Sequence, residues 1–228
     1  MFPRREGSHD EQVVDRRADV TSSVAREYAV FVDAARKSDR LPPPPERLAD
    51  GQVTDGVFVD PKEATGLLRV AARRAAGLYR STRRTEVVWV EGDSELAVGM
   101  AGVGIETGDG LVQVTIPVRC DQSGPATVKV IFAVGAPDSP AGLFASTFRR
   151  PTGPRIVVDT WGDALVAYAW QCVLGMVAGL SGAVGKDARG NVLGPSELIA
   201  TRKGLQIVPM ARHRFSGSSG LTTPRPRT

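Results

Sequence analysis

The longest run without a charged side chain is the feature that most constrains the fold. Residues 164–185 contain no Asp, Glu, Lys or Arg over 22 positions, which is long enough for a helix to cross a bilayer core of about 30 Å. The run consists mainly of small residues, includes Gln171 and Ser181, and has basic residues on both flanks, so it encodes no orientation across a membrane. We therefore predict a helix buried inside a soluble domain, with a membrane-spanning helix as the alternative.

The start of this helix is predicted at Thr160, because the Thr160 hydroxyl and the Asp163 carboxylate fit a capping box. Small residues would let the helix lie close to strands, and three large aromatic residues would supply packing area: Trp161, Tyr168 and Trp170. We expect the helix to form the buried spine of the domain. Short strands are predicted before it at residues 143–148 and 155–159.

Residues 86–135 are predicted to form antiparallel strands. In residues 112–118, and again in 128–134, apolar residues recur at every second position, which is the period of a strand with one buried face. Gly-Asp and Ser-Gly-Pro segments separate the expected strands. These strands are 86–90, 95–100, 103–107, 111–119 and 127–134, followed near the end of the domain by 198–202 and 205–208. The chain is therefore predicted to be α+β, with a mostly antiparallel sheet packed against the buried apolar helix.

An arginine-rich helix is predicted from Asp60, which can cap it together with Glu63, to about Ser81. Opposite its apolar face lie Arg69, Arg73, Arg80, Arg83 and Arg84. Guanidinium groups gathered in this way repel one another unless acids or an anionic partner pair with them. We regard this face as a candidate anion-binding site for nucleic acid or an acidic protein surface; a solvated or internally paired face is the equal alternative.

The N-terminal region predicts an amphipathic helix over residues 9–38 that begins with a capping box of Ser8 and Glu11. The candidate partner-binding residues on its apolar stripe are Val13, Val20, Val24, Tyr28 and Phe31. Four prolines, Pro42–Pro45, follow it and favour a stiff extended spacer. We expect this helix to dock onto a partner protein or a second copy of the chain.

These segments divide the chain into four parts. They are an N-terminal helical arm (1–40), a proline-rich linker (41–56), an α+β domain (57–214) and a disordered basic tail (215–228). The net charge of +4 arises near the C-terminus, because residues 201–228 contain six Lys and Arg and no acid. Such a segment can bind anionic partners, but we favour a solvated tail.

One short motif is typical of hydrolases. Gly92-Asp93-Ser94 follows the apolar strand 87–90 and resembles the first block of the GDSL/SGNH hydrolases, in which a serine nucleophile lies just after a strand. The resemblance covers about four residues and implies a nucleophilic Ser94. Those families place an aspartate three positions before the catalytic histidine, whereas Met210 stands at that position before His213. We favour the alternative that Gly92-Asp93 is a hairpin turn.

Cofactor and metal sites gain no support from the sequence. The two histidines, His9 and His213, lie far apart in the chain, and neither Cys120 nor Cys172 has ligand-spaced neighbours. The glycine-rich segments match no phosphate-binding pattern. We therefore expect no metal and no cofactor.

The functional prediction follows by elimination. We expect a cytoplasmic, non-enzymatic interaction or assembly protein that docks through its N-terminal helix and forms homo-oligomers, without membrane insertion. The first alternative is a nucleic-acid-binding protein that uses the arginine-rich helix face and the basic tail. The second is a serine hydrolase of the SGNH type.

Overall fold

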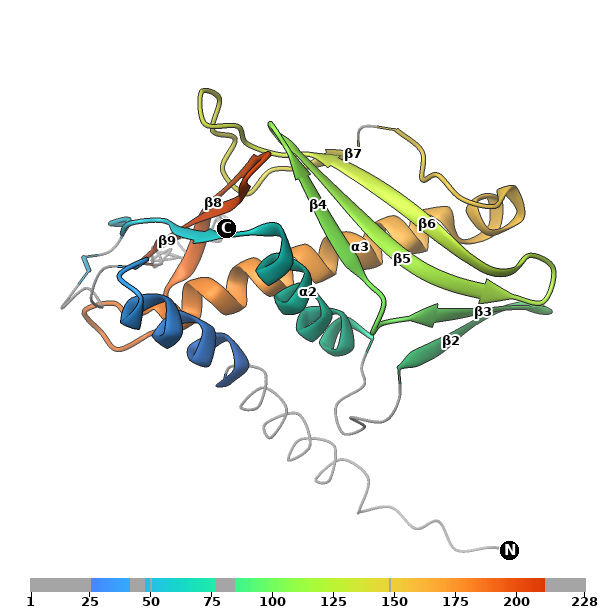
Figure 1. Ribbon diagram of the computed structural model, residues 1–228, viewed down its shortest axis with the longest axis horizontal. Coiled ribbons are helices and arrows are strands. Elements are labelled where there is room, and N and C mark those ends of the chain that lie inside the picture. The colour runs from blue at the N-terminus through green and yellow to red at the C-terminus, as the bar shows by residue number, and fades with distance from the viewer. Residues whose placement is uncertain (1–25, 42–47, 50, 77–84, 148, 212–228) are drawn as a thin grey trace, which may run out of the picture.

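The computed structural model describes residues 26–41, 48–49, 51–76, 85–147 and 149–211. After a helical segment at residues 26–37, which we call the N-terminal helix, the elements are β1 (Val57–Val59), α2 (Pro61–Ala75), β2 (Glu86–Glu91), β3 (Ser94–Gly99), β4 (Gly104–Gly108), β5 (Leu111–Cys120), β6 (Gly124–Ala133), β7 (Ser146–Thr147), α3 (Arg155–Val184), β8 (Gly194–Thr201) and β9 (Gly204–Met210). The fold is α+β, as predicted: two antiparallel sheets share the long helix α3 (Figure 1).

The larger sheet has the strand order β2-β3-β5-β6-β7, and β4 also pairs with β5. Since β6 follows the whole of one edge of β5, β3 and β4 share the other edge: β4 pairs with residues 111–115, and β3 pairs with Val118 and Arg119. Between them, a Cβ at Gly102 would lie 2.6 Å from Cγ of Pro117. Glycine at position 102 therefore permits the chain to pass from β3 to β4 over Pro117.

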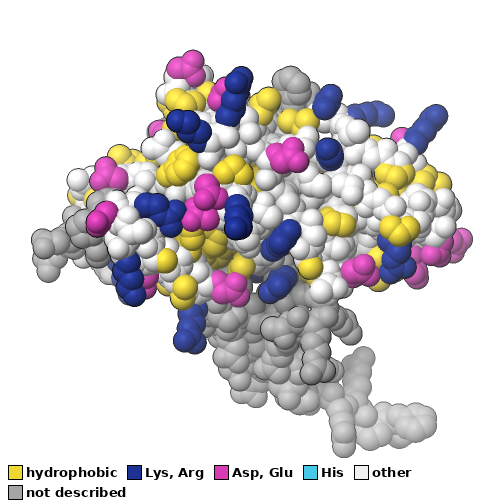
Figure 2. Space-filling model, viewed as in Figure 1, with side chains coloured by type: hydrophobic (Ala, Val, Ile, Leu, Met, Phe, Trp, Pro, Cys, Tyr) yellow, Lys and Arg dark blue, Asp and Glu magenta, His cyan; other side chains and the backbone are white. Residues whose placement is uncertain are grey.

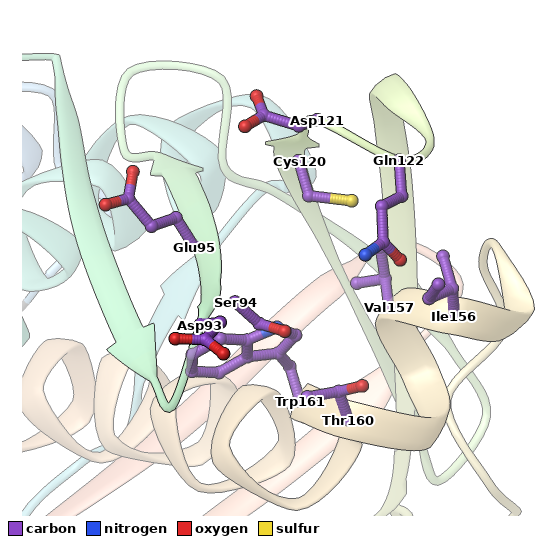
Figure 3. A pocket seen from close by; sticks show the side chains of 10 residues that line it. All are labelled: Asp93, Ser94, Glu95, Cys120, Asp121, Gln122, Ile156, Val157, Thr160 and Trp161. Carbon is purple, nitrogen blue, oxygen red and sulfur yellow. The ribbon is translucent and has the colours of Figure 1, made fainter.

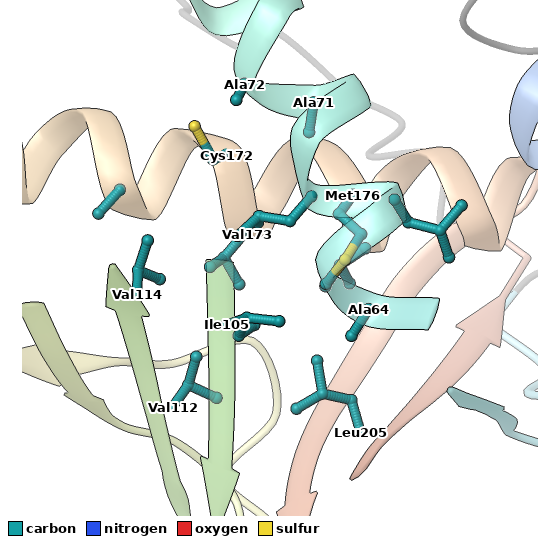
Figure 4. Packing of buried hydrophobic residues seen from close by; sticks show 14 of the residues in the cluster. Ala64, Ala71, Ala72, Ile105, Val112, Val114, Cys172, Val173, Met176 and Leu205 are labelled. Carbon is teal, nitrogen blue, oxygen red and sulfur yellow. The ribbon is translucent and has the colours of Figure 1, made fainter. Parts of the chain in front are cut away.

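The inner face of this sheet is apolar, as the alternating pattern predicts. Its buried side chains include Val112, Val114, Ile116 and Val118 from β5 and Val128, Val130 and Phe132 from β6. Helices α2 and α3 cover this face, and small residues such as Ala71, Ala72 and Cys172 allow the two helices to cross closely (Figure 4). The core therefore lies between the sheet and this pair of helices.

Helix α3 begins at Arg155, so the predicted start at Thr160 is wrong. Pro154 precedes the helix with φ −55°, and no side chain caps it. The strand predicted at 155–159 forms the first turns of α3 instead. The side chain of Val157 is buried there, and this packing overrides the strand preference of the β-branched run. The strand predicted at 143–148 is reduced to β7.

Buried side chains occur along the whole of α3, from Val157 to Val184. Trp89 of β2 packs against Trp161 and Tyr168, with ring centroids 6.2 and 5.5 Å apart. Among the described helices, α3 is the one long and apolar enough to cross a membrane, and half of its most apolar stretch is buried inside the fold. The packing of this apolar helix against the sheet is confirmed.

Helix α2 starts as predicted, because Asp60 and Glu63 form a capping box with each other's backbone N–H groups. It ends at Ala75 rather than near Ser81. The last fully buried side chain of α2 is Ala72.

The smaller sheet has the order β1-β9-β8 and joins distant parts of the chain. Val57 and Val59 of β1 are buried, and β1 pairs with residues 205–207 of β9. The two strands predicted near the end of the domain correspond to β8 and β9, which pair with each other antiparallel. The second half of α3 packs against this sheet (Figure 1).

The described part of the N-terminal helix belongs to the same core. Tyr28, Val32 and Ala35 are buried in one cluster with residues of α2, α3 and both sheets. The Tyr28 hydroxyl donates a hydrogen bond to the Leu67 carbonyl of α2 at 3.1 Å. After the helix, Arg40 forms an ion pair with Glu63 at 2.8 Å. The described part of the N-terminal helix and Arg40 therefore both contact α2.

Candidate functional site

The β2–β3 hairpin carries the segment that resembles a hydrolase motif. Glu91 pairs with Ser94, so Gly92 and Asp93 form a two-residue turn, and the φ of Gly92 is +58°. Positive φ at the first central residue is the type II′ geometry that matches the twist of a hairpin, and glycine is favoured there. The predicted turn is therefore confirmed, and Ser94 is the first residue of β3.

A shallow cleft of about 90 Å³ lies beside this turn, between the tips of two hairpins and the start of α3 (Figure 3). The β2–β3 hairpin contributes Asp93, Ser94 and Glu95, the β5–β6 hairpin contributes Cys120, Asp121 and Gln122, and α3 contributes Ile156, Val157, Thr160 and Trp161. Three carboxylates and an indole ring thus line one small space. The cleft brings together Ser94 and Cys120, which are 26 positions apart in the chain.

The two cysteines of the chain differ in chemistry. Cys120 is half-buried at the cleft, and the Ser123 hydroxyl, 3.0 Å from its Sγ, lowers the pKa of the thiol. Cys172 is buried between α2 and α3, and this burial raises the pKa of its thiol to about 12. Cys120 is therefore the more nucleophilic thiol of the two at neutral pH.

The cleft does not assemble a serine triad from the described residues, because His9 and His213 both lie outside them. Nor do the described residues contain a group of three or more His, Cys, Asp or Glu that could hold a metal ion. A second hollow, of about 200 Å³, lies on the other side of Thr160 and is lined by Arg150, Asp159 and Asp163 among others. Asp159 there forms an ion pair with Arg155 at 3.2 Å.

The most exposed apolar surface near the cleft is on β2. Val88 and Val90 point away from the core and are 55% and 65% exposed. Val87 and Trp89 point the other way and are half-buried against the core. At the tip of this hairpin, Glu91, Asp93 and Glu95 are exposed. Figure 2 shows acidic side chains gathered at this end of the molecule.

The backbone of β2 is open on one side. Among the described strands, β2 pairs with β3 alone and lies at the border of the sheet (Figure 1). Residues that flank a two-residue turn exchange hydrogen bonds, so Glu91, Trp89 and Val87 direct their backbone groups toward β3. Val88 and Val90 then direct theirs toward the open edge. On this open edge, exposed apolar side chains thus stand beside backbone donors and acceptors that pair with no other described strand.

The predicted partner-binding residues have mixed positions. Tyr28 is fully buried in the chain's own core, and Phe31 is half-buried beside Arg40, whose guanidinium lies 6.0 Å from the ring centroid. Val13, Val20 and Val24 lie outside the described residues. The described part of the predicted stripe thus packs within the molecule.

The predicted anion-binding residues are not brought together by a single described helix. Arg69 donates a hydrogen bond from Nε to the Val103 carbonyl at 2.9 Å, so it links α2 to the start of β4. Arg73 is exposed in the last turn of α2. Arg80, Arg83 and Arg84 follow the end of α2 and lie outside the described residues.

Sequence reasoning identified Ser94 and Cys120 singly but missed the cleft and the open edge of β2. Nothing local indicates that the β2–β3 and β5–β6 hairpins end beside the same turns of α3. A signal for the edge was present: two valines occupy the solvent side of a strand whose other side carries Val87 and Trp89. Comparison with protein-family models, with curated proteins and with solved structures finds no match for this chain.

Proposed function

We propose that the chain is a non-enzymatic interaction or assembly protein that binds its partner along the open edge of β2. The observation that carries this proposal is the coincidence of Val88, Val90 and unpaired backbone groups on one exposed strand. An exposed apolar edge strand readily pairs with another strand, and natural proteins usually protect such edges with charges, proline or bulges. Here the charged residues Glu86 and Glu91 stand at the ends of β2 and leave its centre apolar.

Strand addition would use both properties of this edge. The backbone groups would supply hydrogen bonds, and the two valines would supply apolar contact on alternate positions of the added strand.

The residues of the N-terminal helix that were predicted to bind a partner fall into two groups. Docking through Val13, Val20 and Val24 stays a prediction, whereas Tyr28 and Phe31 pack inside the molecule. We therefore assign the partner surface to β2 and not to the described part of that helix. Nucleic-acid binding through the arginines and hydrolysis at Ser94 remain alternatives that no described contact favours.

The proposal is tested with a photo-crosslinking amino acid at Val90, in the cells that produce the protein. A matched control carries the same amino acid at Val53, which is 53% exposed and lies before β1, away from the open edge. We expect discrete crosslinked products from position 90 that are missing from position 53. The added change Val88→Lys should remove them, because it places a charge at the centre of the edge.

Products of the same size and yield from both positions would show that position 90 meets other proteins only by chance, and would overturn the proposal. Products at position 90 that survive Val88→Lys would also contradict it, since they would arise without strand pairing.

A further inference from the structure

We infer that the open edge of β2 binds the same edge of a second copy. The two β2 strands pair antiparallel, and the two-fold axis passes between Val88 and Val88 of the partner subunit. This inference rests on the proposed function, because it assigns a partner to the same edge. It fixes a register, and the register follows from the backbone of the hairpin.

The hydrogen-bonding groups of the edge belong to alternate residues. Since Val87, Trp89 and Glu91 direct their backbone groups toward β3, the free groups on the outer side are those of Glu86, Val88 and Val90. An added antiparallel strand must place its own outward-directed residues opposite these three. With a second copy, Glu86, Val88 and Val90 can therefore pair only among themselves.

The number of hydrogen bonds selects the register. When Val88 faces Val88 of the partner subunit, Glu86 faces Val90 of the partner subunit and the reverse pair also forms, which gives three residue pairs. Each such pair exchanges two backbone hydrogen bonds. A shift by one pairing step either way leaves only two pairs within the strands, because β2 ends at Glu86 and Glu91. The register through Val88 is thus the one with most hydrogen bonds.

The side chains of β2 suit this register. In this register Glu86 lies opposite Val90 of the partner subunit, so no glutamate faces its equivalent directly. Glu86 and Glu91 also point to opposite faces of the strand. Val88 meets Val88 of the partner subunit on the solvent face. On the inner face, Val87 meets Trp89 of the partner subunit, and Trp89 already packs against Trp161 and Tyr168.

Two features favour a second copy over a basic strand from another protein. Glu86, the acid that faces the added strand, is already paired with Arg119 of its own chain at 3.2 Å. In addition, the opposite border of the sheet is partly covered, because β7 and the Thr152 backbone pair with β6. A two-fold pairing of one open edge uses the same surface on both chains and closes at a dimer.

The first measurement is the mass of the purified full chain by sedimentation equilibrium. We expect a reversible dimer of twice 24.2 kDa. Val88→Lys should give a monomer, and Val53→Lys should leave the dimer unchanged. Val88→Pro should also give a monomer without loss of the fold, because the Val88 N–H points away from β3 and proline there removes no hydrogen bond of the hairpin. Circular dichroism checks that the variants fold.

The second measurement tests the register by disulfide formation in a Cys120→Ser background, in which the remaining cysteine, Cys172, is buried. Val88→Cys should crosslink rapidly, since the two Cα atoms of a directly opposed pair lie about 5.5 Å apart. Val90→Cys should not, because its equivalent is displaced by four residues, or about 14 Å.

A monomeric parent chain overturns the inference, as does a dimer whose mass is unaffected by both Val88→Lys and Val88→Pro. Rapid crosslinking through position 90 and not through position 88 also overturns it, because the register would be different. If the chain is monomeric while the photo-crosslinks at Val90 contain another protein, the proposed function stands and only the second copy is excluded. If those crosslinks are missing as well, both fail.

Discussion

Tyr28 shows how one residue attaches the N-terminal helix to the rest of the molecule. Its ring lies over Gly179 of α3, where an added Cβ would stand 2.5 Å from Cε2 of the ring, and its hydroxyl bonds to α2. We predict that Gly179→Ala destabilises the protein by about 1–3 kcal/mol, because a rigid ring must move away from the new methyl group. Urea unfolding measures the change.

The control for this prediction is the same substitution in a Tyr28→Ala background. Removal of the ring itself should cost about 3–5 kcal/mol. Once the ring is missing, Gly179→Ala should cost nothing or stabilise the helix, since alanine has the higher helix propensity. Equal effects of Gly179→Ala in both backgrounds would mean that the two residues are not in contact.

The sequence predicted several features at this scale and missed others for a physical reason. The turn at Gly92-Asp93 and the capping box of Asp60 and Glu63 are local, so neighbouring residues suffice to predict them. For Tyr28, an apolar stripe predicts that the helix face is covered, but not by what. In the structure Tyr28 contacts Leu67 and lies against Gly179, which are 39 and 151 positions away.

At the scale of elements, the strands of the larger sheet were predictable, but the start of α3 and the end of α2 were not. The strands β2 to β6 match the predicted ranges to within a few residues, and over residues 112–118 of β5 and 128–132 of β6 every second side chain is buried. The first turns of α3 carry an Ile-Val-Val run that by itself favours a strand, and α2 ends at Ala75 rather than near Ser81. The order β2-β3-β5-β6, with β4 beside β3 on β5, depends on contacts that no local pattern encodes.

The burial of α3 gives a prediction for this element. Met176 is fully buried beneath α2, whereas Ala178, on the same turn, is exposed (Figure 4). Met176→Asp should destabilise by more than about 4 kcal/mol, because the change removes core packing and buries an unpaired charge. Ala178→Asp should cost about 1 kcal/mol or less. Thermal unfolding of both variants is the measurement.

In a membrane-spanning helix, a carboxylate at Met176 or at Ala178 would have to be taken into lipid or against another helix. Similar, severe effects of both substitutions, together with partition of the parent chain into detergent, would contradict the packing of α3 inside a water-exposed fold.

At the scale of the whole molecule, Asp187 lies where the loop after α3 meets the segment at Leu48. Its carboxylate forms hydrogen bonds within that loop. It accepts hydrogen bonds from the backbone N–H groups of Arg189 and Asn191, and Leu48 pairs with the backbone beside it. The bond from the Asn191 side chain is the main cause of its lowered pKa. A lowered pKa in the folded state stabilises the fold above the ordinary aspartate value of about 4, and this contribution is lost as the pH falls through the folded value.

We therefore predict that Asp187→Asn lowers the urea midpoint at pH 7 and that the difference from the parent shrinks below about pH 4. The parent should lose stability with acid more steeply than the variant. The exposed Asp138→Asn serves as a control for the loss of one surface charge. A difference between parent and Asp187→Asn that stays constant from pH 7 to pH 3 would refute the link to ionisation.

The pairing of β1 with β9 has a consequence for synthesis of the chain on the ribosome. Residues 57–59 leave the ribosome long before their partners at 205–207. Until β9 has been made, Val57 and Val59 lack their neighbour strand, whereas the hairpin of β2 and β3 is already available. Contacts of such long sequence separation form slowly and leave apolar segments accessible to chaperones. The smaller sheet therefore closes only after synthesis of β9, and the larger sheet can begin to form earlier.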